Sequence, residues 1–184
     1  MLHGAVVGLR SREAMDVAVL HAGLYEDVAE HNRSDSRPWV PVSAGSEKSP
    51  YAVGEASDRA ICFSVVRRSD DALAGEALLW QLDTHNRSAH IGIALLPGFR
   101  GQGLGRDAVA VLCHYGFVVR GLNRLQVDTL ADNAPMIGAA ERLGFRREAL
   151  LRRSAWVNGE FVDEVLLGLL AQEWRADPAG TAAN

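Results

Sequence analysis

Residues 95–112, LLPGFRGQGLGRDAVAVL, combine the residue types that bind a phosphate group. Glycines alternate with Gln102 and Leu104, Arg100 and Arg106 flank them, and apolar residues with helical spacing follow at once. Glycine lets a backbone approach an anion closely, and the N-terminus of a helix directs N–H groups and partial positive charge toward it. Arginine adds bidentate charge suited to a pyrophosphate. The stretch therefore predicts an anion-binding loop between a strand and a helix.

Two familiar phosphate loops fit this stretch poorly. Gly98 and Gly103 have the spacing of a Walker A loop, but Leu104 and Gly105 occupy its Lys and Ser/Thr positions. Gly103 to Ala108 satisfies the dinucleotide fingerprint G-x-G-x-x-A, and Asp128 follows at about the distance of its ribose acid. However, PGFRGQ separates these glycines from the preceding strand, and Asp128 falls inside a predicted strand. We therefore expect neither an ATP site nor an NAD site.

The bulk composition limits the possible partners and location. The 184 residues are 48% apolar and 23% charged, which predicts a single domain over residues 1–175 with a disordered tail over 176–184. A net charge of −4 argues against nucleic acid and anionic membranes as partners. Since the chain has no long apolar run and no signal peptide, we expect a cytoplasmic protein. Cys62 and Cys113 lack ligand spacing, so we expect no metal site or disulfide, and both thiols buried.

The predicted elements that must position the loop alternate between strands and helices. Two helices late in the chain, one long and one short, separate strands, and Asn158-Gly159 is a strong hairpin signal, so the class is α+β with a mixed sheet. We expect strands over 4–11, 60–68, 72–83, 89–96 and 123–130, one or two helices over 12–31, a loop over 32–50, helices over 104–118 and 134–145, and a hairpin over 149–170.

Several segments together resemble one enzyme family. Arg100, Gly103 and Gly105 fill the Arg/Gln-x-x-Gly-x-Gly/Ala signature of the acetyl-CoA pyrophosphate loop in the GNAT N-acetyltransferase superfamily. Residues 132–149, DNAPMIGAAERLGFRREA, resemble its Asn…Gly-Phe helix, and residues 156–170 resemble its closing hairpin. SRPWVP, at 36–41, is similar to a segment of the RimJ/RimL-type subfamily. The matches run in the family's order from about residue 5 to about residue 175.

The resemblance implies a fold, a donor and an acceptor. The GNAT fold has a mixed, mostly antiparallel sheet of about six to seven strands flanked by about four helices, and acyl-CoA lies in the splay between two central strands. The implied reaction is direct transfer from acetyl-CoA to a primary amine, on a protein N-terminus or a small molecule, in a ternary complex. A homodimer is compatible with the family. A CoA-binding sensor or scaffold with little or no catalysis, and transfer of another acyl group such as succinyl, remain alternatives.

The resemblance also assigns residues to the donor. It implies backbone contacts to the pantetheine arm at two positions of the strand before the loop, and a side-chain contact from Asn133, which fits a helix N-cap equally well. The donor-binding residues are expected to be Ile93, Leu95, Arg100, Gly101, Gln102, Gly103, Leu104, Gly105, Arg106 and Asn133.

The catalytic groups depart from the family pattern. Met136 and Ala140 stand where relatives carry a Ser or Tyr that protonates the leaving thiolate. His90 stands where many subfamily members carry Glu and shares a strand face with Gly92 and Ala94, which leave room for a ligand. The period-2 pattern places Glu76 on one apolar face of its strand with Leu78, Trp80 and Leu82. A carboxylate on that face either lines the cleft or lies at the edge of the strand in solvent. His90 and Glu76 are thus the candidate bases, with His31 and His85 expected at the surface and Trp39 covering the cleft or anchoring its loop.

Overall fold

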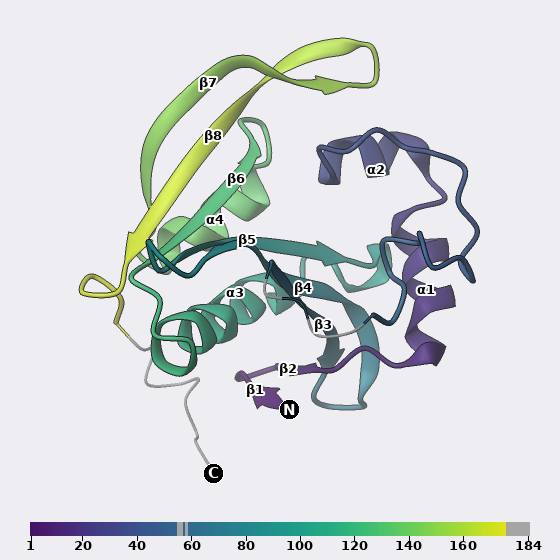
Figure 1. Cartoon of the computed structure of the whole chain (residues 1–184), viewed down its shortest axis with the longest axis horizontal. Helices are drawn as coiled ribbons and strands as arrows, with labels where there is room; N and C mark the ends of the chain where they lie inside the picture. Colours follow the sequence, from purple (N-terminus) through teal and green to yellow (C-terminus); the bar gives the residue numbers. More distant parts are fainter. Residues whose placement is uncertain (55–56, 58, 176–184) are drawn as a thin grey trace.

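The sheet at the centre of the molecule has eight strands, in the order β1-β2-β3-β4-β5-β6-β8-β7, in a computed structural model that describes residues 1–54, 57 and 59–175 (Figure 1). This is the expected mixed sheet with more strands than predicted, and the predicted tail lies outside the described residues. The strands are β1 (Leu2–His3), β2 (Val7–Arg10), β3 (Ala60–Arg67), β4 (Ala72–Asp83), β5 (Ser88–Leu95), β6 (Arg124–Leu130), β7 (Arg146–Val157) and β8 (Glu160–Leu170).

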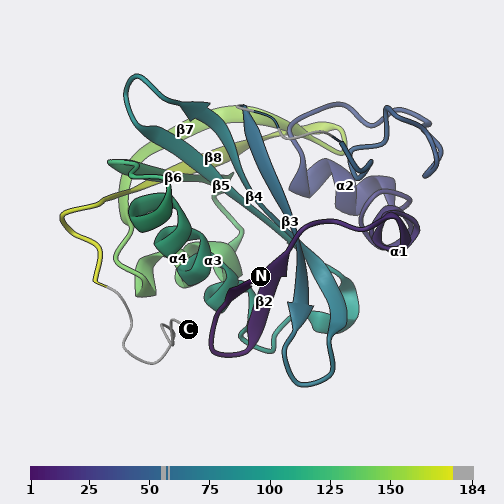
Figure 2. The same ribbon diagram turned by 60° about the horizontal axis from the view of Figure 1, so that its bottom comes forward.

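Four α-helices in the described part of the chain complete the expected α+β fold: α1 (Ala14–Leu24), α2 (Val28–Ser34), α3 (Leu104–His114) and α4 (Ala134–Arg142). The helix predicted over 104–118 ends in a π-helical turn (Tyr115–Val119) that continues α3. Figure 2 shows α3 and α4 side by side against the sheet, with α1 and α2 at its opposite end. Among residues 1–54, 57 and 59–175, no helix has the length and apolarity that crossing a bilayer requires.

The strands β5 and β6 form the one parallel pair of the described sheet. They pair at Ser88–Arg124, Ala89–Leu125 and His90–Gln126, and no further pairing joins them in the described chain although β5 continues to Leu95. All other neighbouring strands are antiparallel. The register therefore opens the sheet at its centre, with His90 at the last paired position.

The two faces of the sheet differ in burial. Ala77 and Leu79 of β4 are fully buried in the main core, which also contains the inward face of α3. Glu76, Leu78 and Trp80 share the other face, as predicted, and are only partly buried. Leu82 does not share that face, since a register shift between Trp80 and Asp83 turns it to pack against the main core.

A second apolar cluster attaches α1 and the loop after α2 to the sheet. It consists of Leu20, Leu24, Tyr25, Tyr51 and Leu96. The Trp39 indole donates to the Tyr25 carbonyl oxygen at 3.0 Å, so this side chain anchors its loop. His31, predicted at the surface, is buried, because its ring packs edge-on against Tyr25 with centroids 4.7 Å apart. His85 is exposed as predicted.

Candidate active site

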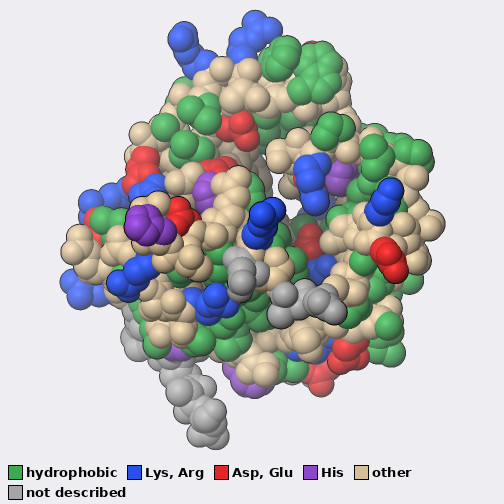
Figure 3. Space-filling model, viewed as in Figure 1, with side chains coloured by type: hydrophobic (Ala, Val, Ile, Leu, Met, Phe, Trp, Pro, Cys, Tyr) green, Lys and Arg blue, Asp and Glu red, His purple; other side chains and the backbone are tan. Residues whose placement is uncertain are grey.

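The open centre of the sheet is enclosed by α2 and the β7–β8 hairpin, two elements far apart in the sequence. Figure 3 shows a hollow on this face, between the hairpin and α2, with both basic and acidic side chains around it. Contacts at three places tie α2 to the rest of the enclosure. They are Asn158 Nδ2 donating to the Ala29 carbonyl oxygen at 3.1 Å, Arg33 pairing with Asp132 at 2.8 Å, and Arg100 pairing with Glu30 at 2.7 Å.

The glycine loop has the conformation that an anion site needs. Gly101 and Gly103 have φ values of 73° and 80°, in the left-handed region that favours glycine. A Cβ built on either residue meets no heavy atom of the described chain within 4 Å, so the space that a side chain would fill is open. Gly103 is the N-cap of α3, and no described side chain caps that helix. The first N–H groups of α3 are thus available to a pyrophosphate.

The side chains around the loop mostly shape it. Arg100 donates to the Leu95 carbonyl oxygen at 3.1 Å and pairs with Glu30, so it connects the loop to the end of β5 and to α2. Gln102 donates to the Gly98 carbonyl oxygen at 2.8 Å, which closes the turn. Arg106 is exposed on the first turn of α3. Arg100 therefore needs to exchange Glu30 for a phosphate if it is to bind the donor.

The remaining predicted donor residues lie on both sides of the splay. Ile93 and Leu95 are in the part of β5 that extends beyond the pairing with β6. Asn133 caps α4, since its side-chain oxygen accepts from the Met136 backbone N–H at 3.3 Å. Its amide nitrogen donates to the Thr129 hydroxyl at 2.9 Å. The N-cap interpretation of Asn133 is confirmed, and its contact with the donor stays a prediction.

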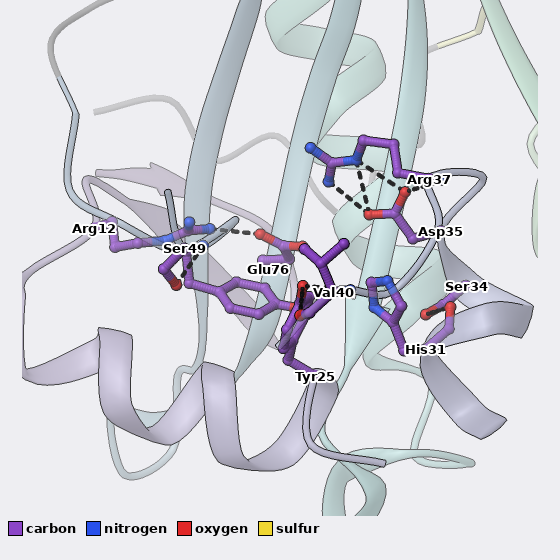
Figure 4. A network of polar contacts seen from close by, with 10 residues as sticks. Arg12, Tyr25, His31, Ser34, Asp35, Arg37, Val40, Ser49 and Glu76 are labelled. Carbon is purple, nitrogen blue, oxygen red and sulfur yellow. Dashed lines mark hydrogen bonds and ion pairs between the residues drawn. The ribbon is translucent and has the colours of Figure 1, made fainter. Parts of the chain in front are cut away.

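Glu76 faces the enclosed hollow but is already engaged. Its carboxylate accepts from Arg12 Nη2 at 2.6 Å, and the Arg12 side chain is only 6% exposed (Figure 4). Burial raises the pKa of the Glu76 carboxyl above its ordinary value, against the opposing effect of the Arg12 guanidinium. Arg12 precedes α1 and gave no signal in the sequence. Because Glu76 Oε2 is held by a buried cation, this carboxylate is a poor candidate for proton transfer.

Other groups near Glu76 are paired or inert. Asp35 and Arg37 form a bidentate pair beside it, and Figure 4 shows them across from Arg12. Burial raises the pKa of the Tyr51 hydroxyl, which keeps that group protonated. Cys62 is exposed, so the prediction that both thiols are buried is wrong for this residue and confirmed for Cys113. The reason is that Cys62 lies on the open face of β3, in register with Leu78.

His90 stands at the mouth of the splay with one ring nitrogen occupied. Its Nδ1 hydrogen-bonds the Asp128 carboxylate of β6, and its ring packs against Trp80 with centroids 4.8 Å apart. Burial raises the pKa of Asp128, but hydrogen bonds from His90 and Gln126 outweigh it and hold the pKa below its ordinary value. The face shared by His90, Gly92 and Ala94 is confirmed by the register with β4.

Asp128 was not among the predicted catalytic residues. From the sequence it was considered only as a possible ribose ligand of a dinucleotide site. A usable signal existed in β6, where Arg124, Gln126 and Asp128 alternate with apolar residues. Strict alternation of this kind indicates a strand with one polar face. In the structure that face looks toward the hollow, because Gln126 is in register with His90.

Comparisons with known proteins agree with this geometry. The model of the GNAT acetyltransferase domain matches residues 7–146. YdaF of Bacillus subtilis, named as a candidate ribosomal N-acetyltransferase, is 34% identical over 59% of this chain and 59% of its own length. The spermidine N(1)-acetyltransferase of Escherichia coli K12 is 26% identical over 93% of this chain and 89% of its own. A Vibrio cholerae spermidine N-acetyltransferase, solved with CoA and spermine, superposes with a TM-score of 0.80 at 20% identity, covering 92% and 98%.

The chain belongs to the GNAT acetyltransferases, and within them to the RimJ-like group. The donor of this family is acetyl-CoA, and the glycine loop has the open backbone that its pyrophosphate needs. The match spans 59% of the length of YdaF and 63% of the length of p20, an N-acetyltransferase of Bacillus licheniformis.

Proposed function

We propose that the protein transfers an acetyl group from acetyl-CoA to a primary amine, on a protein N-terminus or a small molecule. The observation that carries the proposal is the position of the glycine loop at the same opening of the sheet as His90. The glycine loop follows the end of β5, at one side of the splay. His90 is the last residue of β5 that pairs with β6. One substrate can thus be held by its phosphates while its far end reaches a titratable group.

The residues present fit the donor, which supplies a thioester as an activated acyl group. The amides at the start of α3 and the open space at Gly101 and Gly103 would receive the pyrophosphate. The unpaired part of β5, including Ile93 and Leu95, would align the pantetheine arm. The enclosure formed by α2 and the hairpin then limits water at the reacting carbon, which favours attack by the amine.

The charges around the hollow favour an acceptor with a single amine over a polycation. Three carboxylates of the surrounding elements already have a cationic partner. They are Glu30 with Arg100, Asp35 with Arg37, and Glu76 with Arg12. A polyamine would have to displace these partners to gain counter-charges, and Arg12, whose side chain is only 6% exposed, would be left as an uncompensated buried cation. An α-amine or a monoamine makes no such demand.

A two-stage assay tests the proposal. In the first stage, acetyl-CoA, NAD, FAD and ATP are added separately, and thermal unfolding is followed. Acetyl-CoA at about 100 times its Kd is expected to stabilise the protein by about 2.7 kcal/mol, with no effect of the other three. Stabilisation by NAD and none by acetyl-CoA would refute the assignment of the loop.

In the second stage, thiol release is measured over a panel of amines. The panel holds peptides with free N-termini, amino acids, monoamines and spermidine, each with acetyl-CoA and with succinyl-CoA. We expect release with peptides or monoamines and a lower kcat/KM with spermidine. Binding of acetyl-CoA with no release from any amine would instead favour the CoA-binding sensor, and preference for succinyl-CoA would correct the acyl group.

A further inference from the structure

We propose that Asp128 is a positioning residue that fixes the His90 ring so that its Nε2 accepts the proton of the attacking amine. This inference rests on the proposed function, since it names the base of the same reaction. It assigns a role to the pair formed by β5 and β6 and removes Glu76 as the competing base.

The geometry of the pair fixes the tautomer of His90. An ionised carboxylate can only accept hydrogen bonds, so Nδ1 must carry the proton that Asp128 receives. The low pKa of Asp128 keeps this carboxylate ionised throughout the neutral range. Neutral His90 therefore has an unprotonated Nε2, and the described chain makes no hydrogen bond to that atom. The ring nitrogen that a base requires is left available.

Asp128 is itself held in place from the side away from His90. Its second carboxylate oxygen accepts from Gln126 Nε2 at 2.7 Å, and the Gln126 oxygen accepts from Arg124 Nη2 at 3.0 Å. Arg124 also pairs with Glu148 of β7 through its Nη1 at 2.9 Å. Arg124, Gln126 and Asp128 thus form a row of hydrogen-bonded side chains on the partly buried face of β6, and this row ends at His90. Because both oxygens of Asp128 accept a hydrogen bond, the carboxylate is fixed in one orientation, and it fixes the His90 ring in turn.

The location suits a base for the acyl-transfer step. His90 is the last residue of β5 paired with β6, so its ring stands where the splay opens. Gly92 and Ala94 follow on the same face, but the space at Gly92 is filled by Leu78 of β4, since an added Cβ would lie 2.7 Å from Leu78 Cδ2. The face of Trp80 holds the ring from β4. The His90 side chain is 21% exposed, which is enough contact with the hollow for a substrate amine to reach it.

The proposed step balances without any further reactant. The amine nitrogen forms a bond to the acyl carbon, the carbon–sulfur bond breaks, and CoA leaves as the thiolate. The proton lost by the nitrogen moves to His90 Nε2, and the resulting imidazolium is stabilised by Asp128. The imidazolium returns this proton to solvent, and the thiolate is protonated by water, since Met136 and Ala140 provide no acid.

The pH behaviour depends on all charged groups around the ring. These are Asp128 and Arg124 from β6, Glu148 from β7, and Glu76 with its partner Arg12 from β4 and the segment before α1. Arg124 is balanced by Glu148, and Glu76 by Arg12, so Asp128 is the charged group that contacts the His90 ring directly. Removing its charge removes the group that stabilises the imidazolium formed in the transfer step.

The first test reads the tautomer directly by nitrogen NMR of the histidine rings in the whole protein. His90 signals are assigned by their loss in His90→Ala, among the six histidines of the chain. We expect a protonated Nδ1 and an unprotonated Nε2 at high pH, and a mixture of the two tautomers in Asp128→Asn, whose amide can donate as well as accept. A ring protonated on Nε2 in the wild-type protein would overturn the proposal, whether or not the protein is active.

The second test is the pH profile of kcat/KM with the best amine of the panel. We expect His90→Ala to lose about 100-fold. Asp128→Asn is expected to lose about 10-fold and to change the rising limb, because the ring loses the carboxylate that orients it and stabilises its protonated form. Asp71→Asn, the same change on an exposed turn residue, serves as the matched control and should leave the profile unchanged.

The outcomes separate the two proposals. Transfer by the wild-type protein with a rising limb that Asp128→Asn does not move would refute the role of Asp128 alone. Glu76→Gln flattening that limb would assign the base to Glu76 instead. No transfer to any amine would refute the proposed function, and with it the catalytic role of His90, independently of the tautomer.

Discussion

Replacing Gly103 by valine separates the binding role of the glycine loop from its role as a turn. A left-handed φ of 80° costs an L-residue about 1–2 kcal/mol, and a β-branched one somewhat more. No described atom lies within 4 Å of the new Cβ, so no steric clash adds to this cost. We therefore expect Gly103→Val to fold, with a loss of about 2 kcal/mol in the free energy of unfolding.

The same side chain fills the space that the pyrophosphate would occupy. The wild-type protein should gain about 2.7 kcal/mol from CoA at about 100 times Kd, which for a chain of this size raises the Tm by roughly 5–10 °C. Gly103→Val should show a shift close to zero at the same CoA concentration. The measurement is thermal unfolding followed by circular dichroism, with and without CoA.

Gly159 offers a matched control in the β7–β8 turn. Its φ is 97°, and a Cβ built on it also meets nothing of the described chain within 4 Å, so Gly159→Val carries similar strain far from the loop. This variant should lose similar stability and keep the full CoA shift. A full CoA shift in Gly103→Val would show that the loop is only a turn. A shift lost equally in Gly159→Val would show that strain, and not blocked space, is responsible.

Two further predictions concern carboxylates that hold the scaffold. Burial would raise the pKa of Asp16, but hydrogen bonds from Arg10, from the Glu13 backbone and from Ser64 hold that pKa at about 2. The ionised carboxylate therefore stabilises the folded state above the unfolded pKa, and this contribution is lost as the pH falls through 2. Urea unfolding between about pH 5 and pH 2 should show the wild-type protein losing about 2 kcal/mol more than Asp16→Asn, and parallel losses would refute this. Asp107 accepts from the Val6 amide at 2.7 Å and from the amides on either side of it. Asp107→Ala should lower the free energy of unfolding by about 2–3 kcal/mol and speed hydrogen exchange over residues 4–7, and unchanged exchange there would contradict it.

The sequence predicted the strands and helices well where the signal was local. The Asn158-Gly159 turn, the glycines before α3 and the Asn133 N-cap each act within a few residues, and the structure has them as expected. The contacts of the candidate bases were not predictable in this way. Arg12 reaches Glu76 across 64 positions and Asp128 reaches His90 across 38, and such pairs depend on strand order and register.

Burial was predicted least well for side chains whose surroundings depend on contacts between segments far apart or on an irregularity in a strand. His31 was expected at the surface because it was placed in a turn, but it lies in α2 and the aromatic ring of Tyr25 covers it. Period-2 alternation placed Leu82 on the same face of β4 as Leu78 and Trp80, but the register shift after Trp80 turns Leu82 toward the main core.

The three attachments of α2 make this short helix a point of thermodynamic linkage between the two substrates. Arg100 belongs to the donor loop, and Asn158 belongs to the hairpin on the other side of the hollow, yet both contact the same helix. If the donor draws Arg100 away from Glu30, one attachment is lost and the mobility of the helix changes for the acceptor as well. Linkage is reciprocal, so the acceptor must then alter the affinity for CoA by the same factor. The strength of this coupling between the two substrates thus depends on a seven-residue helix that lies outside the loop and the His90–Asp128 pair.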